Sequence, residues 1–353
     1  MQSTIWPWRA KAWRGSVSMR VATLLTAPEL RYDPRLVDVL SAAVSRFYAE
    51  LDQHTPFLAP KVRTWIDSLY GGLPVAHAFR SPAAFPMVLL PWMLEETLRG
   101  EPDGAFQGDL AFASINGYHY IRLLDNVMDR DAPPSPEILP SLGFFYYQAH
   151  AAYQSHFAYA HPFWQAYSAC WFRCAEVTAR DASLDQLDRP RFVEVAAQKT
   201  SAGKIPLAAV CWKYDRADLF DSWAEFHNML GCWHQMSNDV RDWQTDRLHA
   251  NATYFLSEAA RRKRPAESVA EWIVREGYQW AVGVLREWMA EMQAQAVRLS
   301  SPVLLAYLEA RERLQNEQHR LYLEVLPYLA RTLDALTSRD KRERSWVTDV
   351  QIQ

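Results

Sequence analysis

Residues 219–247 read LFDSWAEFHNMLGCWHQMSNDVRDWQTDR, and two patterns overlap in this stretch. Apolar residues return every three or four positions, which predicts a helix. On one face of that helix stand three side chains with oxygen ligands, Asn238, Asp242 and Asp246, with Arg241 beside them. Acids four residues apart repel each other by a few tenths of a kcal/mol. We therefore expect either a salt-bridged helix face or a bound cation to offset that repulsion.

The helical period of this stretch continues over most of the chain. Glycine is scarce, with 12 residues, and alternating β-branched strands are absent. Proline, glycine, aspartate or asparagine interrupts the period at short breaks, which is typical of helix ends. The clearest predicted helices span residues 34–53, 138–180, 190–214, 219–247, 266–300 and 302–336. The sequence thus predicts an all-α fold, a single domain of roughly ten helices or more.

No linker composition divides the helical region, so we place one domain at residues 34–338 and a polar tail at 339–353. Residues 1–33 form a separate arm in which three tryptophans alternate with basic residues. We expect this arm to be flexible or to cap an anionic ligand.

Composition limits the partners of the protein. The chain has 353 residues, of which 49% are hydrophobic and 22% charged, and its net charge of -3 gives no basic field for nucleic acid. Its four cysteines show no metal-site spacing, so we predict buried thiols in a reducing compartment. No apolar run reaches the about 18 residues that span a bilayer, and no signal peptide is evident. We therefore expect no membrane insertion and a cytoplasmic location.

A second acidic cluster lies in HYIRLLDNVMDRDAPP, residues 119–134. Asp125 and Asp129 are four residues apart on the last turns of a predicted helix, where negative charge opposes the helix dipole. Magnesium would reverse that penalty, because carboxylate oxygens are the ligands it prefers. The alternative is a solvated helix end whose acids pair with Arg122 or Arg130.

Together the two clusters indicate a specific chemistry. Two or three magnesium ions held between two such columns can bind a diphosphate and neutralise the charge that develops as it leaves. An allylic cation would then form on the remaining hydrocarbon, and aromatic π faces attract cations. The predicted helices are rich in aromatic residues, which could line a deep central pocket as a group although most of them singly are core residues.

The motifs resemble those of the class I isoprenoid synthase superfamily over roughly residues 35–335. DNVMD at 125–129 looks like its first aspartate-rich motif, DDxxD, with Asn126 in place of the second Asp. NDVRDWQTD at 238–246 looks like the NDxxSxxxE triad of terpene cyclases, with Asp242 for Ser and Asp246 for Glu. The resemblance implies the isoprenoid synthase fold. It also implies three Mg2+ as cofactor, bound by Asp125, Asp129, Asn238, Asp242 and Asp246.

Further matches imply residues that hold the diphosphate. Lys199 and Thr200 resemble the KT pair of prenyltransferases, and Arg320 and Tyr322 resemble the late Arg-Tyr pair of cyclases with one residue inserted. Arg241 completes the implied set of diphosphate donors. The implied activity is a terpene synthase acting on a prenyl diphosphate, with farnesyl or geranylgeranyl diphosphate as substrate and cyclisation or deprotonation as outcome. A homodimer is compatible with the resemblance.

The sequence differs from the family's motifs at some positions, and these differences rank the alternative activities. YGGLPVAHAFRSP at 70–82 lacks the Lys and Arg that elongating prenyltransferases use for isopentenyl diphosphate, which disfavours chain elongation. Head-to-head coupling, as in squalene and phytoene synthases, stays open because both acidic clusters contain a DxxxD pair. A helical isoprenoid-binding or scaffold protein without catalysis is the alternative from another class.

Overall fold

A computed structural model of the chain describes residues 30, 32–82, 84–129, 135–181, 184–249 and 251–324. All regular elements in these residues are helices and no strand occurs among them, so the predicted all-α class is confirmed. The predicted arm lies outside them apart from residues 30, 32 and 33, and the tail at 339–353 lies outside them entirely. None of the helices in the described part of the chain is long and apolar enough to cross a bilayer.

The elements are, in chain order, α2 (Pro34–His54), α3 (Ala59–Tyr70), α4 (Val75–Arg80), α5 (Leu90–Arg99), α6 (Gly104–Asp129), η1 (Pro136–Ile138), α7 (Ser141–Gln154), α8 (Phe163–Asp181), α9 (Arg189–Lys199), η2 (Ser201–Lys204), α10 (Ile205–Lys213), η3 (Ala217–Leu219), α11 (Phe220–Leu248), α12 (Tyr254–Arg262), α13 (Val269–Trp272), η4 (Ile273–Gly277) and α14 (Tyr278–Arg298). A further helix, which we call the last helix, covers residues 302–324.

Three predicted helices are interrupted in the structure. The stretch 138–180 contains α7 and α8 with a turn between them, and 190–214 contains α9 and α10 with the short η2 between them. Proline stands near the start of the second helix in both, at Pro162 and Pro206. A proline ring clashes with the carbonyl group four residues earlier and offers no N–H, so a straight helix cannot pass through it. The stretch 266–300 is split by the π-helical turn η4.

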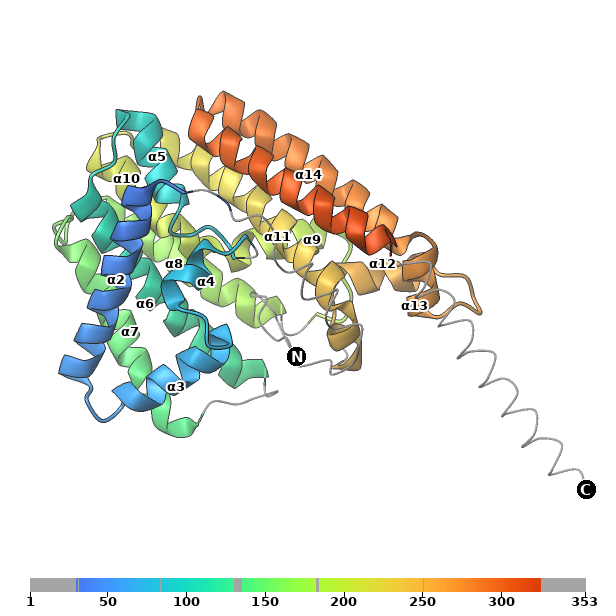
Figure 1. Cartoon of the computed structure of the whole chain (residues 1–353), viewed down its shortest axis with the longest axis horizontal. Helices are drawn as coiled ribbons and strands as arrows, with labels where there is room; N and C mark the ends of the chain where they lie inside the picture. The colour runs from blue at the N-terminus through green and yellow to red at the C-terminus, as the bar shows by residue number, and fades with distance from the viewer. Residues whose placement is uncertain are drawn as a thin grey trace, which may run out of the picture.

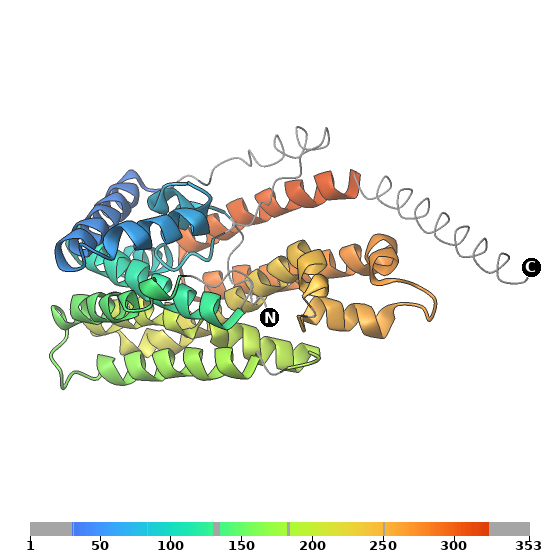
Figure 2. The same cartoon turned by 90° about the horizontal axis from the view of Figure 1, so that it is seen from below.

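The helices pack in layers around α6. This helix contacts α2 on one side and α7 on another, while α8 lies farther from α2 and contacts α9 (Figure 2). Helix α11 packs against α9, α12 and α14. The last helix runs beside α14 (Figure 1). It is antiparallel to α14, since Arg286 is bonded to Asn316 and Gln293 to Glu312.

Candidate functional site

The first acidic cluster lies at the C-terminal end of α6. Tyr118, Ile121 and Asp125 are spaced by three and four residues, so they share one helix face. Asp125 is 2% exposed, and its Oδ2 accepts a hydrogen bond from Arg122 Nη1 at 2.5 Å. The predicted pairing with Arg122 is present, but the idea of a solvated end is wrong for Asp125. Asp129 ends the helix, and its side chain lies outside the described part of the structure.

The second cluster follows one face of α11. Asn238 and Asp246 are buried, and Asp242 between them is partly exposed. Arg241 donates a hydrogen bond to Asn238 Oδ1, and its Nε lies 3.6 Å from Asp242 Oδ1. Asn251 Nδ2 donates to Asp246 Oδ1 at 3.1 Å. Within the described residues the other oxygen of Asp242, Oδ2, is buried without a hydrogen-bond partner.

Burial controls the protonation of this column. Desolvation, and after it the charge of Asp242, raises the pKa of Asp246 to about 7, although the bond from Asn251 and the charge of Lys199 act in the opposite direction. Desolvation also raises the pKa of Asp242, against the neighbouring Arg241. A nearby positive charge favours the ionised carboxylate. The column is therefore an environment in which a cation would stabilise the charged form of both acids.

Asp239 is adjacent to this column in sequence but serves another purpose. Its Oδ1 accepts a hydrogen bond from Gln235 Nε2 at 2.8 Å, and its Oδ2 accepts one from the backbone N–H of Tyr254 at 3.2 Å. Burial, followed by the charge of Asp246, raises the pKa of Asp239 to about 8. Asp239 thus ties the start of α12 to α11, within electrostatic range of Asp246 in the column.

Lys199 ends α9 beside the α11 column and carries a partner that the sequence did not indicate. Its Nζ donates a hydrogen bond to Asp181 Oδ2 at 2.6 Å, and both residues lie at the ends of their helices. The charge of Lys199 also reaches Asp246. Asp181 precedes a break between helices, where aspartate is common, so its position in the sequence gave no signal.

The structure does not bring Arg320 to either acidic cluster. Its side chain is 57% exposed, and its guanidinium group is held by Glu317 and Glu324 on the surface of the last helix. Tyr322 stacks on Tyr278 with ring centroids 4.2 Å apart. The geometry therefore gives no support for Arg320 as a diphosphate donor, whereas the Tyr322 hydroxyl interacts with Trp243 of α11, next to Asp242.

The last helix presents a different arginine to the interior. Arg311 is nine residues before Arg320, and at about 100° per residue it lies on the opposite face. It is 3% exposed, its Nη1 donates to Tyr307 Oη and to the Ala84 carbonyl oxygen, and its guanidinium lies 4.9 Å from the centroid of the Trp233 ring. None of the described carboxylates forms an ion pair with Arg311, and its Nε has no hydrogen-bond partner among the described residues.

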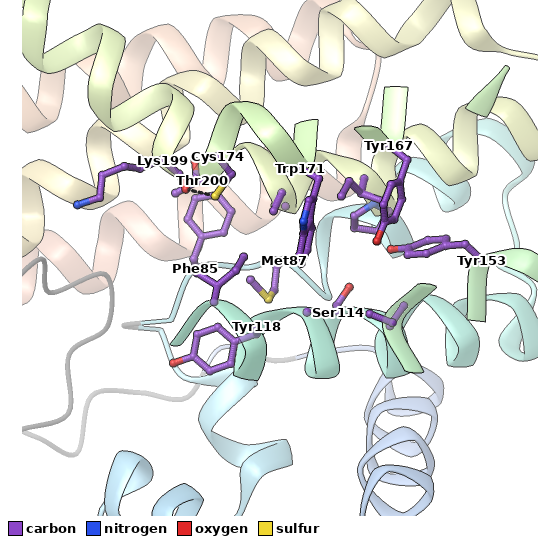
Figure 3. Close-up of a pocket in the computed structure, with 18 residues that line it drawn as sticks. Phe85, Met87, Ser114, Tyr118, Tyr153, Tyr167, Trp171, Cys174, Lys199 and Thr200 are labelled. Atoms are coloured by element: carbon purple, nitrogen blue, oxygen red, sulfur yellow. Dashed lines mark hydrogen bonds between the residues drawn. The ribbon is translucent and has the colours of Figure 1, made fainter. Parts of the chain in front are cut away.

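A cavity lies between α6, α7, α8 and the break between α9 and α10 (Figure 3). Apolar and aromatic side chains form most of its wall, and Lys199 is the one charged residue among those that line it. Tyr118 and Trp171 are among the aromatic residues of this lining. The lining consists of Phe85, Met87, Ala113, Ser114, Gly117, Tyr118, Ile121, Ala149, Tyr153, Tyr167, Trp171, Cys174, Lys199, Thr200, Ala202, Gly203, Ile205 and Pro206.

At one end of this cavity, Asp125 and Asp246 are each within electrostatic range of a lining residue, Cys174 and Lys199 respectively. Asp125 follows the lining residue Ile121 by one turn on the same face of α6. The charges of Asp125 and Lys199 both act on the thiol of Cys174, another lining residue, and Lys199 also acts on Asp246. We call this end, with Asp125, Lys199 and Asp246, the mouth of the cavity.

Two further predictions concern the cysteines and a metal site. The four cysteines are free and buried, as expected. In the part of the chain that the structure describes, no group of three His, Cys, Asp or Glu side chains could hold a metal ion by itself. The unpartnered Oδ2 of Asp242, with the amide oxygen of Asn238 on the same face, still gives α11 a donor set of the type that a hard cation takes.

Compared with known proteins, the chain matches no family model and no curated protein.

Proposed function

We propose that the protein is a class I terpene synthase, that its helices form the isoprenoid synthase fold, and that it ionises an allylic prenyl diphosphate such as farnesyl or geranylgeranyl diphosphate. One observation carries this proposal: Asp125 of α6 and Asp246 of α11 are within electrostatic range of Cys174 and Lys199, at one end of a cavity whose walls are otherwise apolar and aromatic. A diphosphate suits the charged mouth and a hydrocarbon chain suits the wall.

The chain's own residues would divide the work. Asp125, Asp129, Asn238, Asp242 and Asp246 would hold magnesium, which when bound supplies positive charge to the diphosphate as it leaves. Arg241 and Lys199 would turn from Asn238 and Asp181 towards diphosphate oxygens, since charge-assisted hydrogen bonds are the stronger kind. The cavity wall would exclude water, and Trp171 and Tyr118 would present their rings to the hydrocarbon cation.

Arg311 fits the diphosphate better than Arg320. A buried guanidinium group without a carboxylate is costly, and an anion beside it would offset that cost. The charge of Arg311 contributes to lowering the pKa of Arg241, so the two arginines lie within electrostatic range of each other. We therefore assign to Arg311 the role that the sequence pattern suggested for Arg320.

The decisive experiment is incubation of the full chain with magnesium and geranyl, farnesyl or geranylgeranyl diphosphate, with and without isopentenyl diphosphate. Diphosphate release and product mass spectra are measured together. Terpene formed from one allylic substrate alone, and lost in Asp125→Ala and Asn238→Ala, supports the proposal. Longer diphosphates that need isopentenyl diphosphate would indicate elongation, and products of doubled chain length would indicate head-to-head coupling; either result contradicts a cyclase.

The role of Arg311 has its own test. Magnesium with diphosphate should raise the melting temperature of the protein, by the equivalent of about 2.7 kcal/mol at a ligand concentration of 100 Kd. We expect Arg311→Met to remove most of this shift and the matched surface variant Arg320→Met to keep it. Loss of the shift in Arg320→Met alone would return the role to Arg320.

A further inference from the structure

The cavity has a polar group at each end, and only the mouth is used by the proposed reaction. At the opposite end, three hydroxyl groups from three helices converge: Ser114 of α6, Tyr153 of α7 and Tyr167 of α8. Figure 3 shows the hydroxyl groups of the two tyrosines turned towards each other, with that of Ser114 nearby. Ser114 and Asp125 are eleven residues apart on α6, so this end lies about 16 Å along the helix from the mouth. We call it the floor.

The floor hydroxyls are only partly satisfied by the protein. The hydroxyl of Ser114 interacts with that of Tyr153, whereas Tyr167 is 4% exposed and its hydroxyl has no hydrogen-bond partner among the described residues. The two tyrosine rings are 5.7 Å apart, and desolvation raises the pKa of both, so both stay neutral at ordinary pH. Because an unpaired buried hydroxyl costs free energy, the arrangement calls for an oxygen ligand.

A water molecule meets this requirement. A buried site holds water when it is polar, roomy enough and offers two to four partners. The floor offers three hydroxyl groups, while the wall between floor and mouth is apolar. A neutral hydroxyl both donates and accepts, so the three can orient a water oxygen without carrying charge into the cavity.

We infer that the floor is a water-binding subsite and that its water captures the carbocation, so that the product is a terpene alcohol. This inference rests on the proposed ionisation at the mouth. The lone pair of the water oxygen forms the new C–O bond, and the oxonium ion gives up a proton that ends on the diphosphate. Prenyl diphosphate and water thereby give an alcohol and hydrogen diphosphate, with no other reactant needed.

The product test uses the full chain with magnesium and farnesyl or geranylgeranyl diphosphate in water enriched in oxygen-18. We expect an alcohol that carries the heavy oxygen, which excludes simple cleavage of the phosphate ester bond at phosphorus. In Tyr167→Phe the ratio of alcohol to hydrocarbon should fall about tenfold, the factor given by one lost hydrogen bond of ordinary strength. Tyr159→Phe, at a tyrosine that is 94% exposed, is the control and should keep the ratio.

Diphosphate release accompanied by hydrocarbon alone would overturn the capture step while leaving the ionisation intact. An unchanged alcohol ratio in Tyr167→Phe would also overturn it. If no diphosphate is released from any substrate, the proposed function fails instead, and the capture step fails with it.

The subsite itself can be tested without turnover. Removing a hydroxyl that holds a water should lower the melting temperature, whereas removing an unsatisfied buried hydroxyl should raise it. We expect Tyr167→Phe and Ser114→Ala each to melt below the wild type, with no change in Tyr159→Phe. A higher melting temperature for Tyr167→Phe would overturn the water subsite whether or not the protein is an enzyme.

Discussion

At the scale of single residues, His119 shows how burial changes a titrating group. It lies in α6, and its Nε2 is 3.2 Å from the hydroxyl of Tyr70. Desolvation lowers the pKa of His119 to about 3. Its ring is surrounded by six aromatic rings: Phe47, Trp65, Tyr70, Phe79, Tyr118 and Phe145.

The stability of the protein should therefore depend on His119 in acid. When folding lowers the pKa of a histidine, its contribution to the free energy of unfolding is fully present above the unfolded pKa of about 6.5. That contribution is lost as the pH falls towards 3, by up to about 1.4 kcal/mol per pH unit. His119→Phe should reduce that slope between pH 6 and pH 4, which is roughly the window set by the two pKa values. Urea unfolding at several pH values measures the slope. His77→Phe, at an exposed histidine of α4, should leave the slope unchanged. Equal slopes in wild type and His119→Phe would contradict the assignment.

At the scale of helices, one glycine sets how closely α11 approaches α9. A Cβ atom at Gly231 would lie 2.9 Å from both the carbonyl oxygen of Ala196 and Oγ1 of Thr200. The close approach holds the face of α11 that carries Asn238 against the break after Lys199. The sequence shows this glycine but not its contact, because a glycine inside a helical pattern has several explanations.

Gly231→Ala should destabilise the protein by about 1 to 3 kcal/mol, as overpacking of a tight contact does. Gly283→Ala on α14 is the matched control, since a Cβ there meets nothing within 4 Å. Alanine is the better helix former, by up to about 1 kcal/mol, so this control should be neutral or more stable. Chemical denaturation of both variants measures the difference. A Gly231→Ala protein as stable as Gly283→Ala would show that the two helices can separate freely.

At the scale of the whole molecule, the acids of α6 and α11 should act on one ligand. If they do, the effects of Asp125→Ala and Asp242→Ala on kcat/KM are not independent. Each should lower kcat/KM by about 10²- to 10³-fold, and the double variant should lose little more than either alone. The control pairs Asp125→Ala with Asp218→Ala at the surface, where the two factors should multiply. Multiplying factors for the first pair would mean that the clusters serve separate sites.

The sequence by itself determined the helical class and the column of Asn238, Asp242 and Asp246, because these follow from local spacing at 3.6 residues per turn. Only the tertiary structure decided which groups meet. It paired Lys199 with Asp181, turned Arg311 inwards and Arg320 outwards, and closed the far end of the cavity with Tyr153 and Tyr167. Such meetings depend on where helices break and on the angles at which they cross, and neither is encoded in the spacing within one helix.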